Sequence, residues 1–346
     1  MKLSFRWYGA NDNIKLDYIK QIPNMYSVVT AVYDIPVGEV WPMERILTLK
    51  HQAESANLKM EVIESVPVHE DIKLGYPSRD KYISAYIENI KNLAKAGVKC
   101  ICYNFMPVFD WTRTELYKEG KDKSTSLAYY PEQLKNIKPL SGEFNLPGWD
   151  ASYAKEDLKK LFESYSQINN EKLWENLKYF LEAIIPTAKS VGINMAIHPD
   201  DPPWPIFGLP RIITNEANLD RFLKLVDCPN NGLTFCTGSL GADKSNDLVS
   251  MVDKYVKQGR IHFMHVRNIR YAQGGFEESA HDESAGSLNI IGIMKALSDN
   301  GFDGYLRPDH GRMIWGEKGK PGYGLYDRAL GASYLNGVWE TLKKLK

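Results

Sequence analysis

The sequence predicts an α/β fold of the (β/α)8 class, the TIM barrel. Eight short apolar runs rich in β-forming residues alternate with eight segments of helical periodicity along the whole chain. The length of 346 residues also suits a barrel of about 250 residues that carries an insertion. No G-x-G-x-x-G follows the first run, which disfavours a doubly wound sheet, although counting strands leaves closure of the barrel open. We expect one domain over residues 1–346.

Each expected strand is a short apolar run that ends at glycine, proline or a cluster of polar residues. The first run ends at Gly9 and an Asn-Asp-Asn cluster, and the second is followed by Pro36 and Gly38. In chain order, the expected strands are Ser4–Trp7, Tyr26–Tyr33, Lys59–Ser65, Val98–Phe105, Ile193–His198, Leu233–Cys236, Ile261–Val266 and Gly304–Arg307.

Each expected helix is a longer segment with apolar residues at every third or fourth position. Pro42 stands near the start of the second helix, and Gly97 follows the third as a C-terminal cap. In chain order, the expected helices are Ile14–Gln21, Met43–Ala56, Arg79–Ala96, Glu171–Ser190, Ala217–Val226, Asn246–Gln258, Ser287–Asn300 and Tyr326–Lys343.

One connection is much longer than the others. About sixty residues, 107–170, separate the fourth strand from its helix, and they include some helix from Tyr153 to Ser166. A structureless loop of that length would count against the assignment. We therefore expect an insertion after strand 4 that serves as a lid or a subunit contact within the single domain.

The composition excludes several classes of protein. Lys and Arg number 43, as do Asp and Glu, so no basic excess exists for binding nucleic acid. No apolar run approaches the ~18 residues needed to span a bilayer, and the start of the chain lacks the apolar stretch of a signal peptide. Four cysteines are too few for a disulfide framework. We expect a cytoplasmic protein without a membrane or nucleic-acid partner.

Polar residues end the last four expected strands, where the active site of a barrel lies. Because alternate residues of a strand face inward, His198, Cys236, His265 and Asp309 are expected to point into one mouth. Two imidazoles, a thiolate and a carboxylate suit a divalent transition metal, and ligand softness favours zinc. Taken singly, a strand cysteine is usually a small buried hydrophobe, an interpretation we keep for the other three cysteines.

Four further segments carry a resemblance to a known family: FRWYG at 5–9, TAVYDIPVGEVWP at 30–42, RPDHG at 307–311 and PGYG at 321–324. With the strand ends, they resemble mannonate dehydratase from the first strand to the last helix. The resemblance implies a xylose-isomerase-like barrel and dehydration of D-mannonate to 2-dehydro-3-deoxy-D-gluconate, a sugar acid, in hexuronate breakdown. It also implies Mn²⁺ or Fe²⁺ in place of zinc, and a homodimer.

This chemistry removes the C2 proton and expels the C3 hydroxyl. Arg307 would hold the substrate carboxylate or the developing charge, unless it forms an ion pair with a barrel carboxylate. His310 is the candidate general acid and Tyr323 the candidate base, which requires that the metal or a nearby arginine lower the Tyr323 pKa well below the usual ~10; the two roles could be exchanged. Further candidate substrate contacts are Arg6, Trp7, Tyr8 and His281.

Two other functions stay open at this point. A metal-dependent sugar isomerase would use the same kind of barrel, although such enzymes usually bind their metal with a carboxylate-rich set, so Cys236 argues against it. A sugar-acid binding protein with a buried polar cluster would be stable and bind its ligand without metal.

Overall fold

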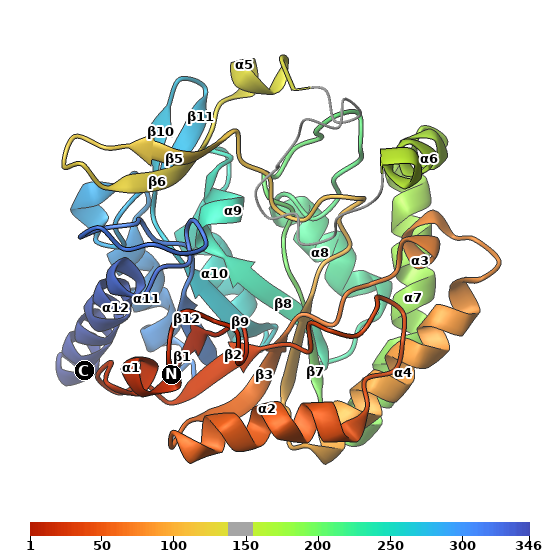
Figure 1. Cartoon of the computed structure of the whole chain (residues 1–346), viewed down its shortest axis with the longest axis horizontal. Coiled ribbons are helices and arrows are strands. Elements are labelled where there is room, and N and C mark those ends of the chain that lie inside the picture. The colour runs from red at the N-terminus through yellow and green to blue at the C-terminus, as the bar shows by residue number, and fades with distance from the viewer. Residues whose placement is uncertain (138–154) are drawn as a thin grey trace.

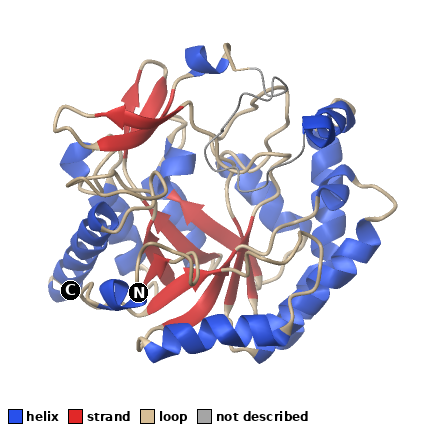
Figure 2. Ribbon diagram, in the orientation of Figure 1, coloured by secondary structure: helices blue, strands red, loops and turns tan. Residues whose placement is uncertain are grey.

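Eight parallel strands close into a barrel in the computed structural model, which describes residues 1–137 and 155–346. Each strand pairs with its neighbours in chain order, and β1 (Lys2–Arg6) closes the barrel against β12 (Tyr305–Pro308). Figure 2 shows the strands at the centre with the long helices around them. The predicted fold class is confirmed, and closure of the barrel excludes the doubly wound alternative.

The eight barrel strands correspond one to one with the eight expected runs, with ends that differ by a few residues. Between β1 and β12 they are β2 (Ser27–Thr30), β3 (Lys59–Glu64), β4 (Cys100–Tyr103), β7 (Asn194–Ile197), β8 (Asn231–Cys236) and β9 (Ile261–Val266). Short runs of β-branched and aromatic residues are thus sufficient to place the strands.

The helices that cover the barrel also lie where the periodicity predicts them. They are α1 (Leu16–Lys20), α2 (Met43–Ser55), α4 (Arg79–Lys95), α7 (Asn170–Val191), α8 (Glu216–Leu225), α10 (Leu248–Lys257), α11 (Ile290–Asp299) and α12 (Tyr326–Lys344). Helix α7 begins after Asn169, whose side chain accepts a hydrogen bond from the Lys172 N–H, and it ends at Gly192 with φ of 72°. Short helices α3 (Glu70–Leu74) and α9 (Thr237–Gly241) and a 3-10 turn (Glu283–Ala285) occur in the loops.

Two apolar layers hold the barrel together. The outer layer lies between the strands and the helices, and the inner layer fills the barrel. The inner layer consists of Val29, Val62, Cys100, Cys102, Ala196, Phe263 and Tyr305. Cys100 and Cys102 are thus buried members of the core, as the sequence suggested.

A second, four-stranded antiparallel sheet was not predicted. The insertion forms β5 (Glu115–Glu119) and β6 (Thr125–Tyr129), and β6 pairs with a hairpin of β10 (Ile269–Ala272) and β11 (Gly275–Glu278). Figure 1 shows this sheet apart from the barrel strands. The insertion therefore shares a sheet with the loop that follows the seventh barrel strand.

The rest of the insertion contains α5 (Pro131–Leu134) and α6 (Lys155–Tyr165). Helix α6 matches most of the expected helix at 153–166, whose first two residues belong to the segment 138–154, outside the described residues. Within the described part of the chain, no helix is long and apolar enough to cross a membrane.

Candidate active site

The carboxyl ends of the barrel strands bring the predicted site residues together. In the strand register Cys236 lies beside His265, and Arg307 lies on the other side of His265. His198 follows β7 directly. Because every barrel strand is parallel to its neighbours, these residues meet at one end of the barrel.

Three of the four predicted metal ligands form a compact cluster. The ligand atoms of His198, Cys236 and His265 lie within 4.8 Å of one another. The fourth, Asp309, has its Oδ2 3.4 Å from the Cys236 Sγ. Glu64, at the end of β3, forms a second such group with Cys102 and His265, and the sequence analysis did not single it out.

The histidines of this cluster present nitrogen atoms suited to a metal. His198 Nδ1 lies 2.7 Å from the Pro199 carbonyl oxygen, which only accepts hydrogen bonds. Nδ1 therefore carries the proton and Nε2 keeps its lone pair. The buried His265 Nε2 lies 3.3 Å from Glu64 Oε2, whereas His265 Nδ1 faces His198 Nε2 at 3.1 Å. These two nitrogens, with the thiol and the carboxylate, fit a divalent transition metal.

Buried ion pairs surround the cluster. Arg307 donates to both Glu64 oxygens, at 2.9 and 3.1 Å, and its Nη1 lies 2.8 Å from Asp309 Oδ1. Burial alone would raise the pKa of Asp309, but Arg307 and the other neighbouring cations hold it well below its usual range. The same balance holds for Glu64, whose pKa is also well below its usual range. Both carboxylates are thus kept ionised.

Arg307 is therefore engaged by carboxylates of the protein itself. All three of its guanidinium nitrogens contact Glu64 or Asp309. The alternative interpretation of Arg307, an ion pair with a barrel carboxylate, describes its observed contacts, and no donor nitrogen is left without a protein contact for a substrate carboxylate.

His310 and Tyr323 form a hydrogen-bonded pair beside the metal-ligand cluster. His310 Nε2 lies 2.8 Å from the Tyr323 hydroxyl, while its Nδ1 lies 2.8 Å from Glu278 Oε1 and 2.7 Å from Arg267 Nη1. Gly322 shapes the approach of Tyr323: its φ is 79°, and a Cβ there would lie 2.5 Å from Leu127 Cδ1. Only glycine tolerates both conditions.

Among the protein groups around it, burial has the largest effect on the pKa of Tyr323. Burial raises it well above its usual value, Tyr8 and Asp309 add to the increase, and Arg307 opposes it. Burial also lowers the pKa of His310, although Glu278 opposes that change. The protein groups alone thus do not lower the Tyr323 pKa, because loss of solvent outweighs the nearby arginine; lowering by a bound metal stays a prediction.

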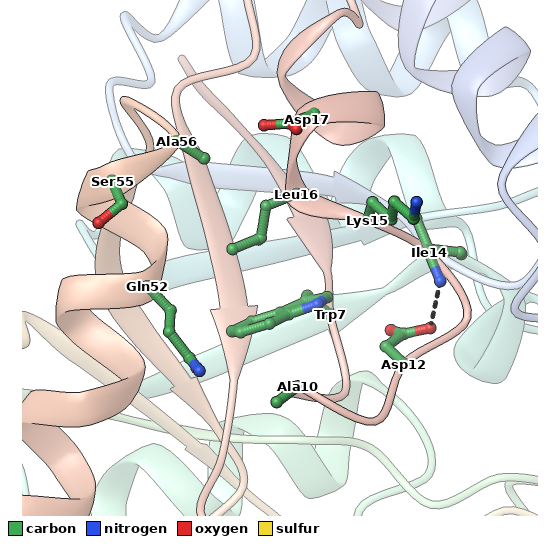
Figure 3. A pocket seen from close by; sticks show the side chains of 11 residues that line it. Trp7, Ala10, Asp12, Ile14, Lys15, Leu16, Asp17, Gln52, Ser55 and Ala56 are labelled. Carbon is green, nitrogen blue, oxygen red and sulfur yellow. Dashed lines mark hydrogen bonds between the residues drawn. The ribbon is translucent and has the colours of Figure 1, made fainter.

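The candidate substrate contacts are divided between two pockets. Arg6 and Tyr8 line the active-site cavity together with His198, Arg307, Asp309, His310 and Tyr323. Trp7 lies between them in sequence and faces the other side of β1, where it lines a separate pocket against the end of α2 (Figure 3). His281 is buried against α12, where its Nδ1 would be 2.4 Å from a Cβ at Gly331. Neither Trp7 nor His281 lines the cavity.

Comparison with known proteins agrees with this arrangement. The family model for D-mannonate dehydratase (UxuA) matches residues 1–346. A mannonate dehydratase 2 of Halalkalibacterium halodurans is 58% identical over 343 residues, 99% of each chain, and a mannonate dehydratase of Streptococcus uberis is 54% identical over 345 residues, again 99% of each. The chain belongs to the D-mannonate dehydratase family.

Solved structures extend this comparison. The crystal structure of mannonate dehydratase from Streptococcus suis serotype 2 superimposes with a TM-score of 0.94 at 50% identity, covering 100% of this chain and 95% of that one. A xylose isomerase domain protein from Planctomyces limnophilus matches with a TM-score of 0.58 at 12% identity, covering 99% of this chain and 98% of that one. The second likeness shows the fold alone, and it agrees with the expected xylose-isomerase-like barrel.

Sequence reasoning missed an ionic network in this D-mannonate dehydratase family member. Arg113, from the insertion, donates to Asp201 and Glu278, and Arg267 contacts the same two carboxylates. Asp201 and Arg267 follow strands β7 and β9, and Glu64 ends β3, so the search at strand ends could have found all three. Glu278 belongs to β11 of the second sheet and Arg113 to the loop before β5, and no motif marked either residue.

Proposed function

We propose that this protein dehydrates D-mannonate to 2-dehydro-3-deoxy-D-gluconate with a bound Mn²⁺ or Fe²⁺. One observation carries the proposal beyond family membership: the His198, Cys236 and His265 cluster lies in the same barrel mouth as the His310 and Tyr323 pair. A metal site adjoining two proton-transfer groups is what removal of water from a sugar acid requires.

His198, Cys236, His265 and Asp309 would hold the metal. Their donor set of two imidazoles, one thiolate and one carboxylate suits a transition metal, and the low pKa of Asp309 keeps that carboxylate ionised. The bound metal would act as a Lewis acid toward the charge that develops as the C2 proton leaves.

His310 and Tyr323 would transfer the two protons of the reaction. One of the pair takes the proton from C2, and the other gives a proton to the C3 hydroxyl, which leaves as water. Their 2.8 Å hydrogen bond allows the proton to pass between them, so the roles of acid and base can be exchanged. Arg307 would act through the metal site, because it holds Glu64 and Asp309 in place.

The decisive experiment is an assay for a 2-keto-3-deoxy acid after incubation of D-mannonate with protein loaded with Mn²⁺ or Fe²⁺ under reducing conditions. We expect product from the wild type and a loss of about 10²–10⁴-fold in kcat in His310→Asn, with its metal content unchanged. A sugar isomerase, the alternative function, would give an isomer of its substrate without loss of water. Absence of the keto-deoxy acid with either metal would refute the proposal.

We also propose that the protein is a cytoplasmic homodimer, in which the insertion at 107–170 acts as a lid or takes part in the subunit contact. Light scattering coupled to size-exclusion chromatography tests the dimer, and a monomer at micromolar concentration would contradict it.

A further inference from the structure

The active-site cavity contains an arginine whose hydrogen-bonding groups are unused. Arg6 ends β1, faces into the barrel and has 7% of its surface exposed. Its Nε and Nη1 atoms are buried and have no hydrogen-bond partner among the described residues. Burying donors in this way is unfavourable unless a partner satisfies them, so the site favours a ligand that accepts hydrogen bonds.

The neighbours of Arg6 keep it charged without satisfying its donors. Burial disfavours the cation, but Tyr33, Glu64 and Tyr8 together raise the Arg6 pKa well above its usual value. The guanidinium carbon lies 4.8 Å from the centre of the Tyr8 ring and 5.8 Å from that of Tyr33. These aromatic contacts stabilise a positive charge and accept no conventional hydrogen bond from it.

Glu64, the carboxylate beside Arg6, already accepts hydrogen bonds from another arginine. Its closest oxygen lies 3.8 Å from Arg6 Nη1, outside hydrogen-bond distance, whereas both of its oxygens accept hydrogen bonds from Arg307. Arg267 is likewise paired with Asp201 and Glu278. Among the three arginines that line the cavity, Arg6 is therefore the one without a hydrogen-bonded carboxylate in the described structure.

Arg6 also lies close to the reacting groups. Its Nη1 and the His265 Nε2 contact the same Glu64 oxygen, at 3.8 and 3.3 Å. On its other side, Tyr8 packs edge-on against Tyr323, with ring centres 5.2 Å apart. A carboxylate bound by Arg6 would thus lie between the metal-ligand cluster and the His310 and Tyr323 pair. The C2 atom of a sugar acid is bonded directly to its carboxylate carbon, so it would lie in the same region.

We propose that Arg6 binds the carboxylate of the substrate and is the residue that selects a sugar acid over a neutral sugar. The inference rests on the proposed function. Arg307 does not supply the contact to the substrate carboxylate, because Glu64 and Asp309 hold its guanidinium group. Lys320, whose Nζ lies 4.4 Å from the centre of the Tyr8 ring, adds positive charge at the same side of the cavity.

The test compares Arg6→Met and Arg6→Lys with Arg45→Met, a control at an exposed arginine of α2 that does not line the cavity. Calorimetry in a His310→Asn background measures binding of D-mannonate and of D-mannitol, which lacks the carboxylate, to the metal-loaded protein. We expect Arg6→Met to weaken D-mannonate binding about 10- to 100-fold and to leave D-mannitol binding unchanged. The affinity of Arg6→Lys for D-mannonate should lie between the affinities of Arg6→Met and Arg45→Met. In the otherwise wild-type protein, Arg6→Met should raise KM more than it lowers kcat.

Thermal unfolding without substrate separates binding from a structural role. Because Arg6 Nε and Nη1 have no hydrogen-bond partner in the described part of the chain, Arg6→Met should not lower Tm, but it should reduce the increase in Tm that D-mannonate produces in the control. An affinity for D-mannonate within twofold of the control in both Arg6 variants would overturn the proposal. Absence of D-mannonate turnover by the wild type would instead refute the proposed function, and the binding comparison would still decide the role of Arg6.

Discussion

At the residue scale, the cysteines show how position decides between packing and chemistry. Cys236 receives a hydrogen bond from Ser239 at 3.0 Å and has two histidines within ligand distance. Cys228 is also buried, but it packs in the apolar core, and its Sγ has only the Asn230 side chain, at 3.9 Å, as a hydrogen-bond partner among the described residues. The strand-end rule distinguished these two cysteines from the sequence, because only Cys236 lies at the carboxyl end of a strand.

We expect Cys236→Ser to weaken Mn²⁺ binding by at least tenfold, since the substitution removes the thiolate ligand; changes outside the ligand shell already cost 10–100-fold. Cys228→Ser is the matched control and should bind Mn²⁺ like the wild type. The measurement is a competition titration of Mn²⁺ against a chelator. Equal affinities in the two variants would refute the assignment of Cys236 as a ligand.

At the element scale, the barrel was predictable and the second sheet was not. Each barrel strand is a local apolar run, whereas β6 and β11 pair across a long stretch of sequence, with Tyr129 opposite Phe276. One local feature of the sequence was the glycine at 274. In the structure, Gln273 and Gly274 form the two-residue turn of the β10–β11 hairpin, with φ of 48° and 75°. A turn residue such as Gly274 can indicate a hairpin, but it does not show which strand pairs with that hairpin.

The second sheet supplies Glu278, which positions His310. Glu278 Oε1 lies 2.8 Å from His310 Nδ1 and also accepts from Arg113 at 2.7 Å. We expect Glu278→Gln to lower kcat with little change in KM, and to destabilise the fold by about 3 kcal/mol, because two buried arginines lose a charged partner. Steady-state kinetics and urea unfolding measure the two effects.

Glu277→Gln is the control for this change. Glu277 precedes Glu278 on the same strand and accepts a hydrogen bond from Tyr130 at 2.6 Å, but it does not line the cavity. Its substitution should leave kcat close to the wild-type value. A similar loss of kcat in both variants would mean that the sheet acts only as a scaffold.

At the scale of the whole molecule, the sequence located the site but not its charge balance. Strand ends and alternation placed the metal ligands at one mouth, whereas His310 and Tyr323 were assigned through the chemistry of the resembled family. The same alternation, applied to β1, would have separated Trp7 from Arg6 and Tyr8. The ion pairs of Arg307 and the raised pKa of Tyr323 depend on burial by elements distant in sequence, so no local pattern predicts them.

The stability of the whole molecule should fall in acid partly because of His262. This residue lies on the face of β9 opposite His265, where its Nε2 would be 2.3 Å from a Cβ at Gly232. Burial lowers its pKa from 6.5 to about 4. The unfolded chain therefore binds a proton that the folded protein does not, and the free energy of unfolding falls as pH decreases from about 6.5 to 4, by up to about 3 kcal/mol. Above pH 6.5 this contribution is complete.

Replacing His262 with Asn should remove that part of the acid sensitivity, whatever constant change in stability the substitution also brings. The measurement is the free energy of unfolding in urea at pH 7 and pH 5, compared with His51→Asn, a control at an exposed histidine of α2. Loss of metal in acid affects both variants alike, so the difference between them isolates His262. The two variants should show unequal slopes against pH, with His262→Asn the shallower. Equal slopes would mean that the buried imidazole is protonated in the folded protein as readily as in the unfolded chain.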